Sequence, residues 1–146
     1  MMKIIIPKLE DISVCAKIYQ NSYKKEPWNE EYEISEIEKY ISSYLDSDTK
    51  VCFALVDGDE IKGVALGLIV PSISAQYLRL EDICIDFTEQ RKGYGSIFME
   101  LISNEVAKLG CDSVILGTQR DFPSHQFYLK NGFRKVESVL MYKDIK

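Results

Sequence analysis

A short segment with two glycines, Gln90-Arg91-Lys92-Gly93-Tyr94-Gly95-Ser96, lies between a predicted strand and a strongly amphipathic predicted helix. At such a junction the backbone N–H groups converge at the helix N-terminus and can hold a phosphate, and glycine lets the backbone approach it closely. The chain lacks the G-x-x-x-x-G-K-[ST] loop, and the segment lacks the third glycine of a dinucleotide loop. It therefore predicts a phosphate-binding loop of another kind, with a plain strand-to-helix turn as the alternative.

Two neighbouring carboxylates, Glu81 and Asp82, precede this loop on a predicted strand over residues 77–85. Adjacent strand residues point to opposite faces, so only one of the two can face a given site. Regular alternation would give them different apolar neighbours: Ile83 and Ile85 beside Glu81, and Leu80 and Cys84 beside Asp82. Apolar surroundings make a carboxylate a stronger proton acceptor, so either residue is a candidate general base.

The cysteines, Cys15, Cys52, Cys84 and Cys111, are widely spaced and form no C-x-x-C pair, and His125 is the only histidine. This composition argues against a zinc site, and we expect no metal. Cysteines within apolar stretches are typical of reduced, buried thiols, which indicates a cytoplasmic compartment. A nucleophilic Cys84 would need an activating base, and His125 lies on a different predicted element, so we interpret Cys84 as a buried thiol.

Hydrophobic periodicity predicts an α/β fold. The predicted elements are a strand over 2–6, helices over 11–23 and about 34–45, strands over 51–56, 61–70 and 77–85, a helix ending at 110, a strand over 113–118, a short helix from 123, and a last strand from 133 to about 142. Strand, helix and strand over 77–118 indicate a right-handed parallel crossover. We therefore expect one domain, 1–146, with a mixed, mostly antiparallel central sheet and one parallel βαβ unit.

The glycine loop, Gln90 to Gly95, resembles the Q/R-x-x-G-x-G/A signature of the GNAT superfamily of N-acetyltransferases. A second segment, Ser124 to Phe133, is similar to the family's A-x-x-F-Y-x-x-x-G-F segment, with serine in place of the usual alanine. Together with the strand over 80–85, the resemblance covers roughly residues 51–142. It implies a GNAT-like fold and an enzyme that transfers the acetyl group of acetyl-CoA directly to a primary amine.

The resemblance also implies how the coenzyme binds. The loop amides would hold the pyrophosphate, and the strand before the loop would pair with pantetheine. The implied coenzyme-binding residues are Ile83, Cys84, Ile85, Gln90, Arg91, Lys92, Gly93, Tyr94, Gly95, Ser96 and Asp121. Arg91 stands where many relatives carry glycine, and Asp121 where relatives often have asparagine.

For the chemistry, Tyr128 matches the family's general acid, and a phenol with a pKa near 10 can protonate a departing thiolate. Glu81 lies in a Leu-Glu-Asp run similar to that of polyamine-type acetyltransferases, so we expect it to be the base and to bind the amine. Trp28 falls where this family builds acceptor specificity, although it could equally join two helices. His125, three residues before Tyr128, is interpreted as a partly exposed helix residue.

Composition limits the partners of the chain. The content of 46% hydrophobic and 28% charged residues is typical of a folded domain, and a net charge of −5 disfavours nucleic-acid or membrane binding. Residues 1–6 are too short an apolar segment for an export signal, and no run approaches the ~20 residues that span a bilayer. We expect a small-molecule amine substrate and, by resemblance, a possible homodimer; a peptide N-acetyltransferase and a non-catalytic acyl-CoA sensor are the alternatives.

Overall fold

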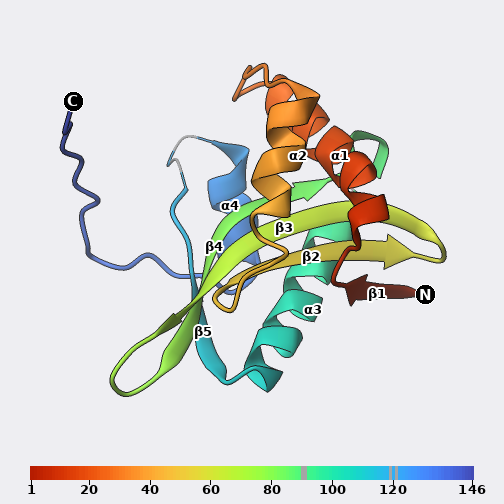
Figure 1. Ribbon diagram of the computed structural model, residues 1–146. Helices are drawn as coiled ribbons and strands as arrows, with labels where there is room; N and C mark the ends of the chain where they lie inside the picture. Colours follow the sequence, from red (N-terminus) through yellow and green to blue (C-terminus); the bar gives the residue numbers. More distant parts are fainter. Residues whose placement is uncertain (90–91, 119, 121) are drawn as a thin grey trace.

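The computed structural model of the protein describes residues 1–146 with the exception of 90, 91, 119 and 121 (Figure 1). Its elements are β1 (Met2–Ile5), the 3-10 turn η1 (Leu9–Asp11), α1 (Ile12–Lys24), α2 (Ile34–Ser42), β2 (Lys50–Asp57), β3 (Glu60–Pro71), β4 (Gln76–Ile85), the 3-10 turn η2 (Phe87–Glu89), α3 (Tyr94–Lys108), β5 (Cys111–Ile115) and α4 (Pro123–Lys130). None of the helices in the described part of the chain is long and apolar enough to cross a membrane.

The strands form one sheet in the order β1-β2-β3-β4-β5. Strands β1 to β4 pair antiparallel, whereas β4 and β5 are parallel neighbours joined through α3. This arrangement confirms the predicted α/β class with a mixed, mostly antiparallel sheet and one βαβ crossover.

Helices cover both faces of the sheet, so its central strands are buried on both sides (Figure 1). Cys52 and Ala54 of β2 belong to the core cluster under α1 and α2. Phe53 and Leu55 of the same strand belong to the cluster under α3. This alternation is the ordinary two-residue period of a strand.

Strand β4 contains one extra residue opposite β3. Leu66 pairs with Asp82, but the next residue, Gly67, pairs with Leu80, so Glu81 has no counterpart on β3. An extra residue of this kind is a β-bulge, and it shifts the strand by one position relative to its partner.

The bulge corrects the expected distribution of side chains between the two faces. Leu80 packs under α3, whereas Cys84 packs under α1 and α2, although an even spacing would place them on one face. Asp82 therefore shares its face with Cys84 and not with Leu80. Ile83 contributes to the α3 side, and Glu81 occupies the bulge itself.

The last predicted strand, 133 to about 142, is not formed. Phe133 packs against the α3 cluster, but the residues after it belong to no helix or strand. The prediction was wrong because strand-forming side chains report propensity, whereas a strand persists only when its backbone finds a partner.

Gly67, at the bulge, offers a test of this packing. A Cβ at this position would lie 2.8 Å from Cδ1 of Leu78 and 2.9 Å from the backbone oxygen of Arg79. We expect Gly67→Ala to lower the free energy of unfolding by roughly 1–3 kcal/mol, as overpacking usually does. Urea unfolding measures the change. The matched variant is Gly117→Ala, whose Cβ would meet nothing within 4 Å; equal losses in the two variants would contradict the close packing.

Candidate active site

Strands β4 and β5 separate part-way along their length. Their pairing runs from Gln76 with Cys111 to Arg79 with Ile115 and ends there. From Leu80 to Cys84, β4 keeps β3 on one side and has no strand on the other among the described residues. An open sheet edge can pair with an extended ligand as if with an added strand. The predicted pantetheine-binding residues Ile83 and Cys84 lie on this open stretch, and Ile85 ends β4 with its carbonyl accepting a hydrogen bond from Ser22 at 3.4 Å.

The glycine loop leads into α3 with an uncapped N-terminus. Gly93 is the N-cap residue, with a φ of 81°, and no side chain caps the helix. A Cβ at Gly93 would meet nothing within 4 Å among the described residues. The N–H groups of Tyr94, Gly95 and Ser96 precede the first intrahelical hydrogen bond, which the N–H of Ile97 donates to the carbonyl oxygen of Gly93. Such N–H groups can bind an anion. Gln90, Arg91 and Asp121 lie outside the described residues.

Gly95 also has a packing role. A Cβ there would lie 2.9 Å from Cε1 of Phe127, so the start of α3 lies directly against α4. Because Tyr128 follows Phe127 on α4, this contact also positions the glycine loop relative to Tyr128.

Lys92, beside the loop, has a carboxylate partner. Its Nζ lies 3.1 Å from Glu89, which also pairs with Lys62 at 3.0 Å. Hydrogen bonds from Lys62 and then from Lys92 lower the pKa of Glu89. The Lys92 side chain is still 58% exposed, so it remains accessible to a phosphate.

Three tyrosine hydroxyls converge on Asp82. Tyr23 donates to Oδ1 at 2.6 Å, Tyr40 donates to Oδ2 at 2.8 Å, and Tyr19 donates to Oδ1 at 3.3 Å. Tyr19 and Tyr23 lie four residues apart on one face of α1, with ring centroids 4.7 Å apart, and Tyr40 comes from α2. Both oxygens of the carboxylate are thus held by two helices.

The environment keeps these phenols protonated. Burial is the largest cause that raises the pKa of Tyr19, Tyr23 and Tyr40, and the negative charge of Asp82 raises each of them further. At neutral pH all three are therefore hydrogen-bond donors, and Asp82 is their common acceptor. The cluster thus places the Asp82 carboxylate next to the three tyrosine side chains.

Glu81, the predicted base, points elsewhere. Its Oε1 accepts from Nε of Arg79 at 2.8 Å, and the side chains of Arg79 and Glu81 are 53% and 34% exposed. The bulge thus separates the two carboxylates: Glu81 joins a surface ion pair, and Asp82 joins the tyrosines. The three tyrosines were not predicted as site residues from the sequence; the four-residue spacing of Tyr19 and Tyr23 was the available signal.

Tyr128, the predicted general acid, lies between the rings of Phe127 and Phe133, with centroids 5.2 and 5.4 Å away. Burial raises its pKa to about 12, with smaller contributions from Cys84 and Asp82. The Cys84 thiol is itself buried, which raises its pKa and leaves it protonated at neutral pH.

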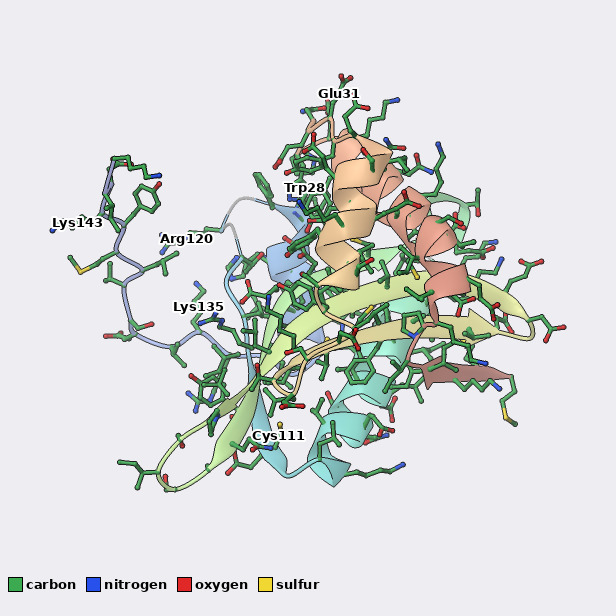
Figure 2. All side chains as sticks on the ribbon, viewed as in Figure 1. Trp28, Glu31, Cys111, Arg120, Lys135 and Lys143 are labelled. Carbon is green, nitrogen blue, oxygen red and sulfur yellow. The ribbon has the colours of Figure 1, made fainter. Side chains whose placement is uncertain are left out.

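Trp28 joins the aromatic cluster to α4. Its ring packs edge-on against Tyr23 at 5.5 Å and against Phe122, just before α4, at 5.8 Å. Figure 2 shows Trp28 near the start of α4, below Glu31 at the outer end of the α1–α2 connection. His125 is turned to the backbone, with Nδ1 3.0 Å from the carbonyl oxygen of Arg120. Trp28 thus closes one side of the cluster.

The comparison with protein families shows the family of the chain. The sequence profile of the Acetyltransferase (GNAT) family matches residues 14–133. The match covers most of the chain, so the protein belongs to the GNAT acetyltransferase family. It is an N-acetyltransferase. Comparison with curated protein sequences gives no match.

Solved structures with the same fold include several acetyltransferases. A possible acetyltransferase from Clostridium difficile 630 has a TM-score of 0.83 at 16% identity and covers 100% of this chain and 99% of its own. Aminoglycoside N-acetyltransferase AAC(6')-Iy in complex with CoA has a TM-score of 0.79 at 14% identity, with coverages of 100% and 96%. An aminoglycoside acetyltransferase from an uncultured soil metagenomic sample, in complex with sisomicin, has a TM-score of 0.76 at 14% identity, with coverages of 99% and 97%.

The raised pKa values of Tyr19, Tyr23 and Tyr40 predict a loss of stability at alkaline pH. The unfolded chain releases tyrosine protons above about pH 10, whereas the folded protein retains them. The folded state then binds more protons, so this stability is complete below about pH 10 and falls as pH rises further. Urea unfolding at a series of pH values measures the slope. Tyr23→Phe should make it shallower, and an unchanged slope would argue against the buried phenol.

Proposed function

We propose that the protein transfers the acetyl group of acetyl-CoA directly to a primary amine of a small cationic molecule. The observation that carries the proposal is Asp82, a carboxylate that three tyrosine hydroxyls of α1 and α2 hold on the stretch of β4 beyond its last β5 partner. The fold relatives that are aminoglycoside acetyltransferases support it, because aminoglycosides are small molecules with several amino groups.

The coenzyme site would use two parts of the chain. The N–H groups of Tyr94, Gly95 and Ser96, with Gly93 before them, would bind the pyrophosphate, and Lys92 could approach a phosphate from solvent. The backbone of Ile83, Cys84 and Ile85 would pair with pantetheine, because β4 extends beyond its last β5 partner. The fit rests on an uncapped helix end and an open strand edge. Gln90, Arg91 and Asp121 remain predictions from the sequence.

The acceptor site would lie at the aromatic cluster. An ammonium group is attracted both by the Asp82 carboxylate and by the faces of aromatic rings. Tyr19, Tyr23 and Trp28 supply such rings, and Tyr32 adds another whose hydroxyl donates to Glu30. Trp28 would then limit the size of the acceptor from the α4 side.

The reaction needs three proton transfers. The ammonium proton of the acceptor passes to Asp82 and from there to solvent, the free amine nitrogen attacks the thioester carbonyl, and a C–N bond replaces the C–S bond. Tyr128, protonated at neutral pH, donates its proton to the departing thiolate, and the second proton that the nitrogen loses as the amide forms restores the Tyr128 phenol. Cys84 takes no covalent part because its buried thiol stays protonated. Asp82 replaces Glu81 as the proposed base, because Glu81 is engaged with Arg79.

Release of free thiol from acetyl-CoA over a panel of polyamines, aminoglycosides and peptides tests this function. We expect release with small multivalent amines, and a fall of roughly 100-fold or more in kcat/KM for Asp82→Asn, since it removes both the charge and the proton acceptor. Glu81→Gln is the matched control and should retain most of the activity.

Four outcomes would contradict parts of this assignment. Equal activity in wild type and Asp82→Asn would remove Asp82 from the site, and a large loss confined to Glu81→Gln would restore Glu81 as the base. Release with peptides alone would indicate a peptide N-acetyltransferase. Binding of coenzyme A, seen as a raised melting temperature, without release to any acceptor would indicate a sensor.

Tyr128→Phe tests the general acid. Removal of the hydroxyl should lower kcat by roughly 10²–10⁴-fold, the usual contribution of a positioned acid, with little change in the KM for acetyl-CoA. The loss should be smaller for acyl donors whose thiol leaves more easily. Tyr77→Phe, in the part of β4 that pairs with β5, is the control. Full kcat in Tyr128→Phe would remove this residue from the mechanism.

A further inference from the structure

Glu89, the residue before the glycine loop, is shared by two lysines. Nζ of Lys62 lies 3.0 Å from its Oε1, and Nζ of Lys92 lies 3.1 Å from its Oε2. Each ammonium group therefore has a carboxylate oxygen of its own. Lys92 can turn away from Glu89 without breaking the bond that Lys62 makes.

The two lysines differ in their surroundings. The side chains of Lys62 and Glu89 are 16% and 13% exposed, so this pair has little contact with solvent. The side chain of Lys92 is much more exposed, which leaves its contact with Glu89 open to water. Water weakens the attraction between exposed charges, whereas a pair with little solvent contact keeps more of it. Lys62 is therefore the firmer partner of Glu89, and Lys92 is the partner that can leave.

The main chain also joins Lys62 to the turn that carries Glu89. The N–H of Asp86 donates to the carbonyl oxygen of Lys62 at 2.7 Å, and the N–H of Glu89 donates to the carbonyl oxygen of Asp86 at 2.8 Å. Glu60 contacts the Lys62 ammonium group as well, at 2.7 Å, but its side chain is 74% exposed. Hydrogen bonds to Glu60 and then to Glu89 raise the pKa of Lys62, so this residue is cationic at neutral pH.

The charge of Glu89 determines what Lys92 can do. A carboxylate with little access to solvent is costly to leave unpaired, so Glu89 would hold Lys92 firmly if Lys92 were its only cation. A carboxylate already paired with Lys62 loses less when Lys92 turns to another anion. Lys92 directly precedes Gly93, the N-cap residue of α3, so it lies beside the helix end at which a coenzyme phosphate would bind.

We propose that Lys62 is a positioning residue of the coenzyme site. By neutralising Glu89, it leaves the Lys92 ammonium group available to a phosphate of acetyl-CoA. The effect of Lys62 passes through Glu89 to Lys92. This inference rests on the coenzyme site of the proposed function, and it adds to that site a residue of β3 that lies outside the glycine motif.

The affinity for coenzyme A, measured by isothermal titration calorimetry without an acceptor, tests this role. We expect Lys62→Met to raise the Kd roughly tenfold, which is the usual scale of coupling between neighbouring charges. The main-chain bond to Asp86 remains in this variant, so it should fold, and its melting temperature checks this. Glu60→Gln is the matched control. It removes an exposed carboxylate from the same ammonium group and should leave the Kd unchanged.

Two double variants separate this role from a general support of the loop. In a Lys92→Met background, Lys62→Met should have little further effect, because the ammonium group that it makes available is absent. Adding Glu89→Gln to Lys62→Met should recover most of the affinity, because the unpaired carboxylate is then removed. Equal losses with and without Lys92 would overturn the proposal. So would a double variant at positions 62 and 89 that binds no better than Lys62→Met.

The wild-type protein separates this inference from the proposed function. Equal Kd values for coenzyme A in the wild type and in Lys62→Met would overturn the role of Lys62 alone. A wild type that binds no coenzyme A would overturn the proposed coenzyme site as well. In turnover, Lys62→Met should raise the KM for acetyl-CoA and leave kcat unchanged, because a phosphate contact is made equally in the ground state and the transition state.

Discussion

The extra residue in β4 determines which carboxylate enters the site. Strand β4 has helices on both of its faces, so its buried side chains pack either under α1 and α2 or under α3. The bulge at Glu81 changes this assignment half-way along the strand. Before the bulge, the alternating residues Leu78 and Leu80 pack in the core under α3. After the bulge, Asp82 and Cys84 face α1 and α2. Without the bulge, the three tyrosines would meet a different side chain.

The site depends on contacts between elements that are distant in sequence. Tyr19 and Tyr40 reach β4 from two helices, and Trp28 connects this group to the segment before α4. On the other side of α4, Phe127 packs on Gly95 at the start of α3. The aromatic cluster, the proposed acid and the glycine loop are therefore held in one packed arrangement. Rigid support of this kind is what positions reacting groups to within fractions of an ångström.

Much of the fold could be predicted from the sequence, because periodicity and turn residues are local signals. The parallel crossover around α3 is confirmed, and the helices and inner strands lie within a few residues of their predicted bounds. The bulge could not be predicted, since a one-residue offset depends on how two strands pair and leaves no trace in composition. The faces of Leu80 and Asp82 were misassigned for this reason. The prediction of the final strand was wrong for a different reason. Residues 133–142 have strand-like side chains, but pairing depends on a partner that local sequence does not specify.

The contact between Gly95 and Phe127 changes what a glycine-rich loop can be taken to mean. The ring of Phe127 fills the space that a side chain at residue 95 would need, so packing within the protein by itself favours glycine there. Gly93 differs, because its surroundings are open and only its backbone angle favours glycine. The two glycines of one motif are thus favoured for different reasons: Gly95 by packing in the folded protein and Gly93 by the backbone conformation of the loop. A homologue could lose the ability to bind a ligand while keeping Gly95. The presence of that glycine alone therefore does not indicate that the ligand binds.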